Sequence, residues 1–200
     1  MKKTLFLLVL LCTACTTLRA QRMPQYPPGW EELENRARLG LSQNLADYLF
    51  LGTLNADIQY SIHRSWTLQV GAKYNNWTWR HRTEDQFESR QQAYYVGVRW
   101  WPWYTYSGWW AGGKLQYREY NRGGLIMRET EEGDAFGTGL SGGYSVHINH
   151  WLDVDFGIGL WGGFTRYVTY ACPYCGERTG EGTKAFFLPD EIRIALMFIL

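Results

Sequence analysis

Strict alternation of apolar with polar or small residues is the feature of this sequence that most limits how it can fold. In the stretch LDVDFGIGLWGGF, residues 152–164, one set of alternate positions holds almost only large apolar side chains. The other set holds Asp153, Asp155, Trp161 and three glycines. A period of two over thirteen residues is the pattern of a β-strand with one apolar face and one polar or small face.

The same pattern recurs along the rest of the chain, in residues 37–44, 54–62, 66–74, 94–100, 109–117, 136–148 and 191–200. Short connections near residues 63–65, 102 and 149–150 alternate with longer polar ones at 44–52, 80–91, 119–134 and 171–184. Short turns at one end and long loops at the other are typical of an up-and-down barrel. The sequence therefore predicts an all-β, eight-stranded antiparallel up-and-down β-barrel.

The distribution of charge on the two strand faces indicates what surrounds this barrel. Acidic and basic residues are interleaved with glycines on one face, as suits a narrow lumen in which opposite charges pair. The other face lacks Lys and Arg at mid-strand, where each would cost about 2–4 kcal/mol in lipid. We therefore expect a transmembrane barrel; a soluble exported carrier resembling a lipocalin, with its apolar face inside, is the alternative. The predicted lumen charge network consists of Arg38, Asp57, Lys73, Arg99, Lys114, Asp153, Asp155, Glu191 and Arg193.

Aromatic residues gather at the three short turns, above all in RWWPWYTYSGWW, residues 99–110, where seven of twelve are Trp or Tyr. Such rings favour the membrane–water boundary because each joins an apolar body to a polar N–H or O–H. The sequence thus predicts a membrane-interface girdle made of Trp66, Trp100, Trp101, Trp103, Tyr104, Tyr106, Trp109, Trp110 and Trp151.

The N-terminus has the features of an export signal. Lys2 and Lys3 precede an apolar run over residues 5–11, and we expect cleavage after Ala20. Lipoprotein processing at Cys15 is the alternative. The expected organisation is a signal peptide at 1–20, a periplasmic leader at 21–35 and the barrel at 36–200, which together indicate the outer membrane of a Gram-negative bacterium. The formal net charge of +1 argues against nucleic acid as a partner.

The motif CPYC, residues 172–175, interrupts a predicted loop. Because exported compartments are oxidising, we expect a disulfide between Cys172 and Cys175 that braces this loop. Redox catalysis would need a helix after the motif, and the glycines that follow oppose one. A metal clip would need two further ligands, and only Glu177 and Glu181 lie nearby in the sequence.

Ser145 and His147 lie two residues apart on the inward face of one predicted strand. Some outer-membrane lipases and deacylases use Ser and His on a barrel wall, but their sites must face lipid. Lumen lining is therefore the preferred interpretation. The sequence holds no P-loop, dinucleotide fingerprint or zinc-protease motif, so we assign no catalytic residue, metal or cofactor.

Three segments carry a family resemblance: YNNWTW at residues 74–79, GVRWW at 97–101, and YACPYCG at 170–176 followed by Pro189 and a final apolar strand. Over residues 36–200 the chain resembles the Bacteroidota outer-membrane barrels grouped as domain-of-unknown-function family 3575. It departs from the family pattern at Asn76, where Pro is usual. The resemblance implies an exported eight-stranded barrel without an established activity, and some members are encoded near fimbrial assembly proteins.

These observations predict a small integral outer-membrane β-barrel with a structural, anchoring or surface-binding role through its exposed loops, and no catalysis. The interior of an eight-stranded barrel is just filled by side chains, so we expect no open pore. Expected partners are outer-membrane lipid and lipopolysaccharide, the barrel-assembly machinery during insertion, and fimbrial or other surface proteins. A lipid-modifying enzyme, a narrow pore and a soluble carrier are the alternatives.

Overall fold

The computed structural model describes residues 39–49, 52–79, 87–123, 129–172 and 176–200. All of them belong to one compact unit, Asn35–Leu200. The predicted signal peptide, the leader, the alternative lipidation site Cys15 and the predicted lumen residue Arg38 lie outside the described residues. Within the described ranges, no helix is long and apolar enough to span a membrane.

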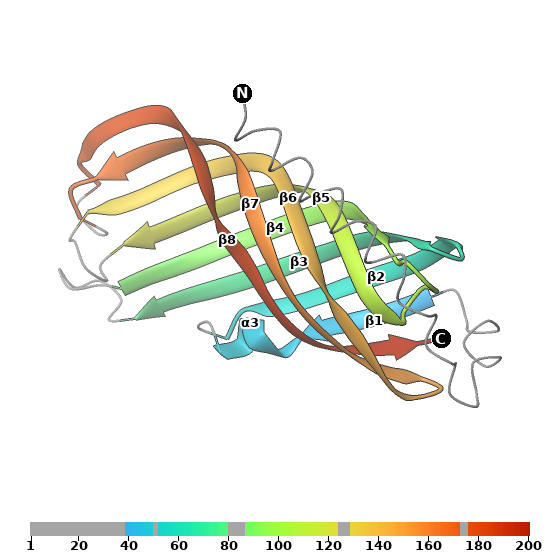
Figure 1. Cartoon of the computed structure of the whole chain (residues 1–200). Helices are drawn as coiled ribbons and strands as arrows, with labels where there is room; N and C mark the ends of the chain where they lie inside the picture. The colour runs from blue at the N-terminus through green and yellow to red at the C-terminus, as the bar shows by residue number, and fades with distance from the viewer. Residues whose placement is uncertain (1–38, 50–51, 80–86, 124–128, 173–175) are drawn as a thin grey trace, which may run out of the picture. The chain divides into compact units, whose positions relative to one another are not determined.

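The described residues form eight antiparallel strands and one short helix (Figure 1). Each strand pairs with the next, and the last pairs with the first to close the barrel. This arrangement confirms the predicted all-β, eight-stranded antiparallel barrel. In chain order the elements are β1 (Leu39–Asn44), α3 (Leu45–Leu49), β2 (Leu54–His63), β3 (Trp66–Trp79), β4 (Phe87–Trp100), β5 (Gly108–Gly123), β6 (Thr130–Asn149), β7 (Leu152–Tyr170) and β8 (Arg178–Ile199).

The later strands are longer than the sequence pattern indicated. Residues 87–91, 119–123, 130–134 and 178–184 belong to strands, although the sequence predicted them as parts of long loops. Backbone pairing continues there, for example between Glu119 and Asp134. Both faces of these extensions are largely polar, so no apolar alternation marks them as strand. Figure 1 shows β6, β7 and β8 continuing well past α3 at this end, which we call the loop end.

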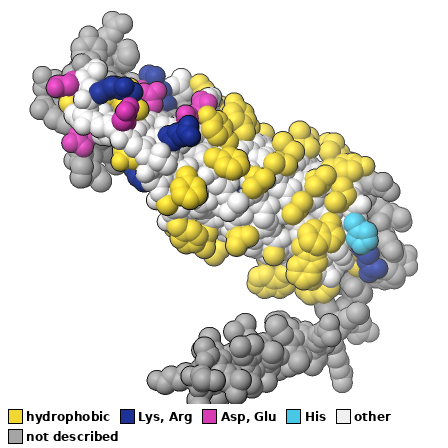
Figure 2. Space-filling view, turned by 90° about the horizontal axis from the view of Figure 1, so that it is seen from above, with side chains coloured by type: hydrophobic (Ala, Val, Ile, Leu, Met, Phe, Trp, Pro, Cys, Tyr) yellow, Lys and Arg dark blue, Asp and Glu magenta, His cyan; other side chains and the backbone are white. Residues whose placement is uncertain are grey.

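The outer surface of the barrel carries a broad apolar band (Figure 2). On β7 the outward set from Leu152 to Phe164 contains no charge, and Ile158 within it is 72% exposed. At about 3.3 Å per residue and a tilt of about 40°, these twelve steps rise about 30 Å, close to the hydrocarbon thickness of a bilayer. The band ends toward the loop end at Glu119, Asp134 and Arg166, which are register neighbours on three strands.

Aromatic side chains also fill the barrel interior near the short turns. The rings of Trp101, Tyr106 and Trp110 pack there with Met197 and Ile199. The ring centroid of Trp101 lies 5.9 Å from that of Tyr106 and 6.4 Å from that of Trp110. We call these five residues the aromatic plug. They close the interior at the end of the barrel where the short turns lie.

The plug corrects part of the predicted interface girdle. Trp101, Tyr106 and Trp110 were expected at the outer boundary, and each is at most 4% exposed. In a strand, adjacent side chains point to opposite faces, so Trp100 and Trp109 face outward while their neighbours Trp101 and Trp110 face inward.

Four of the six other residues of the predicted girdle are exposed on the outer surface. The exposed members are Trp66 at 42%, Trp100 at 45%, Trp109 at 59% and Trp151 at 44%. Trp103 is partly buried. Tyr104 is buried and is a further correction to the predicted girdle; Arg64 donates to its hydroxyl at 2.6 Å and lies over its ring. The contact of the exposed rings with lipid stays a prediction.

Glycines on β6 and β7 make room for the plug, and this can be tested. A Cβ on Gly157 would lie 2.8 Å from Cζ2 of Trp110 and 2.9 Å from the carbonyl oxygen of Gly142. Because neither neighbour is a flexible chain end, we expect Gly157→Ala to lower the free energy of unfolding by about 1–3 kcal/mol. The measurement is the urea midpoint of the protein refolded in detergent micelles.

Gly113→Ala is the matched control, since a Cβ there would meet no atom closer than 3.9 Å. The control should unfold at the wild-type urea concentration. Equal midpoints for Gly157→Ala and wild type would show that the plug does not need this space.

Candidate functional site in the barrel interior

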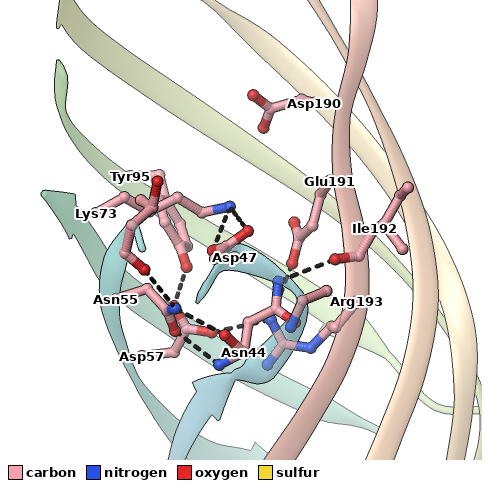
Figure 3. Close-up of polar contacts among 12 residues, drawn as sticks. Asn44, Asp47, Asn55, Asp57, Lys73, Tyr95, Asp190, Glu191, Ile192 and Arg193 are labelled. Carbon is pink, nitrogen blue, oxygen red and sulfur yellow. Dashed lines mark hydrogen bonds and ion pairs between the residues drawn. The ribbon is translucent and has the colours of Figure 1, made fainter. Parts of the chain in front are cut away.

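Ten ionic side chains meet in the interior above the aromatic plug, and we call them the interior charge network. Five are cationic and five are acidic, so their formal charges cancel. Buried ions are tolerated when they are paired in this way. Figure 3 shows part of the network. Its members are Asp47, Asp57, Lys73, Arg99, Lys114, Arg118, Asp155, Asp190, Glu191 and Arg193.

Arg193 on β8 is the centre of this network and is 1% exposed. Its Nη1 lies 2.9 Å from Oδ2 of Asp57 and 2.9 Å from Oε1 of Glu191. Its Nε lies 3.4 Å from Oδ2 of Asp155, and its Nη2 donates to Ser42 at 2.8 Å. One guanidinium therefore connects β8 to β1, β2 and β7. Figure 3 labels Arg193 together with two of its partners, Asp57 and Glu191.

Arg99 joins the charge network to the aromatic plug. Its Nη1 lies 2.9 Å from Oδ2 of Asp155, and its Nε donates to Oε1 of Gln69 at 2.9 Å. Its guanidinium carbon lies 4.1 Å from the centroid of the Trp110 ring. A cation over an indole face is stabilised by the ring quadrupole, more so when both are removed from water. The plug and the network thus form one continuous packing unit.

A β-bulge on β8 brings an additional carboxylate inside. The register shifts so that Glu191 is opposite Gly159 while Pro189 is opposite Leu160, which leaves Asp190 as the extra residue. Pro189 lies directly before the unpaired residue, where the ladder is already interrupted and a proline is tolerated. The Asp190 side chain is fully buried and lies 2.8 Å from Nζ of Lys114.

Asp190 also pairs with Arg118, another residue that sequence reasoning missed. Strict alternation along β8 would place Asp190 on the outward side together with Ile192. The bulge shifts the alternation by one residue, so Asp190 points inward instead. Pro189 inside a strand pattern was the available signal for this irregularity.

Asp47 is the second missed carboxylate. It lies in α3, within residues predicted as a loop, and its Oδ2 is 2.9 Å from Nζ of Lys73 (Figure 3). The helix follows β1 directly and packs against β8. Asn44, at the end of β1, donates its side-chain amide to the carbonyl of Ile192 at 2.9 Å. These contacts tie α3 to the interior at a place where the sequence shows no helical periodicity.

The predicted lumen residues are mostly brought together. Asp57, Lys73, Arg99, Lys114, Asp155, Glu191 and Arg193 all belong to the network. Asp153 is fully buried but lies nearer the short turns, where Oδ1 is 2.9 Å from Nδ1 of His147. Ser145 is buried, and its hydroxyl has no hydrogen-bond partner among the described residues, so it does not form a Ser–His pair with His147.

The cysteine motif is described in part. Cys172 lies just after β7 and is partly buried, whereas Cys175 lies outside the described residues. The disulfide between them stays a prediction. The described part of the chain contains no group of three or more His, Cys, Asp or Glu side chains placed to hold a metal ion.

Comparison with known proteins gives one family. The model of the family described as protein of unknown function (DUF3575) matches residues 6–200. No curated protein matches the chain.

Replacing Arg193 tests how much the interior charge network contributes to the stability of the fold. Arg193→Met would leave Asp57, Asp155 and Glu191 without their shared cation, and removing one partner of a buried ion pair costs about 3–5 kcal/mol. We expect a lower urea midpoint, or failure to refold in micelles.

Arg178→Met is the control, because Arg178 is exposed and lies 3.6 Å from its partner Glu181. An exposed pair contributes at most about 1 kcal/mol. Equal losses in both variants would contradict a central role for Arg193.

Proposed function

The chain belongs to the family described as protein of unknown function (DUF3575), and we propose that it is a small integral outer-membrane β-barrel with a structural, anchoring or surface-binding role. In this proposal the apolar band meets lipid and the loop end meets the exterior. The protein carries out no catalysis. Its place is the outer membrane of a Gram-negative bacterium, reached through the N-terminal export signal and the barrel-assembly machinery.

The observation that carries this proposal is the reversed polarity of the barrel. Arg193 and Asp155 are at most 1% exposed, whereas Ile158 and Leu140 are 72% and 73% exposed. Soluble proteins rarely leave a continuous apolar surface of this extent in water. A barrel in lipid needs an apolar outer band with no edge strands, and closure of β8 on β1 removes the edges. The polarity therefore supports the membrane barrel over the soluble carrier.

The loop end supports a role at the cell surface. There the strands extend beyond the apolar band and carry many charged and amide side chains on both faces. Lipopolysaccharide and fimbrial or other surface proteins are the proposed partners of this end. Polar, rigidly paired strands can present such a surface without the entropic cost of ordering a long free loop.

The barrel interior supports a closed, non-conducting role. The charge network and the aromatic plug fill successive levels of the interior, and their ions neutralise one another. An eight-stranded barrel leaves room for side chains rather than for a channel. A narrow pore and a lipid-modifying enzyme have no comparable observation in their favour among the described residues.

A charge placed on the apolar band tests the membrane proposal. Ile158→Arg puts a cation at the middle of β7, where lipid contact would cost about 2–4 kcal/mol. We expect a strong loss of the folded form in washed outer membranes, measured as the band whose gel migration changes on boiling. Thr183→Arg, which is exposed on the outer side of β8 beyond the band, should leave that form unchanged.

If water rather than lipid surrounded the barrel, the two variants Ile158→Arg and Thr183→Arg would give a different result. An exposed Arg would then be harmless at both positions, and the protein would remain soluble without detergent. That outcome would contradict the proposed function.

A further inference from the structure

A cavity of about 280 Å³ lies in the loop-end half of the barrel interior, next to the charge network. We call it the mouth cavity. One part of its lining is apolar, with Trp161 of β7 and Phe186 and Leu188 of β8. Another part is basic, with Arg118 and Arg122 of β5 and Lys184 of β8. Arg122 and Lys184 have side chains that are 64% and 42% exposed, so the cavity is reached from solvent at the loop end.

The apolar part offers a well-fixed aromatic surface. Trp161 is 2% exposed, and its ring centroid lies 4.4 Å from that of Phe186 with the planes 61° apart. The guanidinium carbon of Arg118 lies 4.4 Å from the Trp161 ring centroid. Both aromatic side chains are therefore held by neighbours before any ligand arrives, which reduces the entropy lost on binding.

The basic part has more cations than carboxylates to neutralise them. Four Arg or Lys side chains occur among the described residues that line the cavity, and no Asp or Glu does. Glu131, beside the cavity, is shared by Arg122 at 3.1 Å and Lys184 at 2.6 Å. Asp190 is likewise shared by Arg118 and Lys114. Arg90, the fourth cation, pairs with Glu88 at 2.9 Å. Glu131 and Asp190 are each shared by two cations, which leaves donors of Arg118, Arg122 and Lys184 available to an anion.

The titration of Glu131 agrees with this surplus of positive charge. Partial burial alone would raise its pKa, but the hydrogen bonds from Lys184 and Tyr120 and the charge of Arg122 hold the pKa of Glu131 below its ordinary value. Glu131 therefore stays ionised at neutral pH, and its oxygens are already taken by Arg122, Lys184 and the hydroxyl of Tyr120.

Two buried donors at this site have no acceptor. Nε1 of Trp161 and Nε of Arg118 are buried and make no hydrogen bond with any described residue. A buried donor without an acceptor costs about 1–3 kcal/mol, so an acceptor atom on a ligand would recover part of that cost. The two unpaired donors and the aromatic rings line the same cavity, which favours a ligand that has both an acceptor atom and a flat apolar body.

We propose that the mouth cavity binds a small organic acid with a flat apolar body. The carboxylate lies among Arg118, Arg122 and Lys184, and the body lies against Trp161, Phe186 and Leu188. A water molecule takes about 30 Å³ of liquid volume, so a cavity of about 280 Å³ has room for about nine water molecules. A substituted benzoate is about the largest molecule that fits in that volume. This site adds a ligand to the proposed structural and surface role, and it does not depend on which membrane holds the barrel.

Fluorine NMR of the purified full-length protein in detergent micelles tests the site, with para-(trifluoromethyl)benzoate as the probe. The neutral para-(trifluoromethyl)benzamide is the matched compound, because it keeps the ring and loses the charge. Empty micelles of the same detergent measure partitioning alone. We expect saturable broadening of the benzoate signal that exceeds the micelle blank, and binding of the benzamide weaker by at least about tenfold, equivalent to about 1.4 kcal/mol.

Variants separate this site from the rest of the surface. The double variant Arg122→Gln with Lys184→Gln should raise the dissociation constant of the benzoate by about tenfold or more. Arg166→Gln is the control: it removes an Arg from the outer side of β7, next to inward-facing Thr165. The heat-dependent gel migration of each variant shows whether it has folded.

Three results would overturn the proposal. They are benzoate binding no greater than the micelle blank, equal binding of benzoate and benzamide, and an equal loss of binding in Arg166→Gln and the double variant. None of these results would alter the expected outcome of the Ile158→Arg test of membrane insertion.

Discussion

Pairing of buried charges around Arg193 is the interaction on which the rest of this structure depends. Its guanidinium reaches carboxylates on β2, β7 and β8 and a hydroxyl on β1, so it holds the seam where the barrel closes. Five cations and five carboxylates neutralise one another inside. Apart from the aromatic plug and a few buried rings such as Trp161, the large apolar side chains of the strands face outward. The outer apolar band thus accompanies an interior that is ionic in its middle and aromatic at the short-turn end.

The strands and the inward residues that follow regular alternation could be predicted from the sequence. The residues at a bulge or in a short helix, where alternation is interrupted, could not. Period-two patterns predicted the strands and placed Asp57, Asp155 and Arg193 in one interior. Asp190 was missed because a bulge reverses its direction, and Asp47 because a five-residue helix is too short to show a period. The aromatic stretch was assigned to one surface, although adjacent residues of a strand must face opposite sides.

The two ends of the barrel differ in chemistry, and that difference gives the molecule a direction. The short-turn end is filled by the aromatic plug, with Arg99 stacked on Trp110 above it. The loop end continues as polar strands and contains the mouth cavity with its surplus of basic side chains. The ligand proposed for the mouth cavity would enter from the loop end, because paired charges and rings fill the interior beyond the cavity. The proposed anchoring or surface-binding role fits this difference between the ends better than a channel does.

Nuclear Overhauser contacts of the wild-type protein in lipid nanodiscs test the central claim most directly. The methyl groups of Ile158 and Leu140 should show cross-peaks to lipid acyl-chain protons, because both side chains lie in the exposed apolar band. The methyl group of Thr183, beyond the band, should show cross-peaks to water instead. If Ile158 and Leu140 contacted water and showed no contact with acyl chains, the barrel would not be embedded through this band and the account would be wrong.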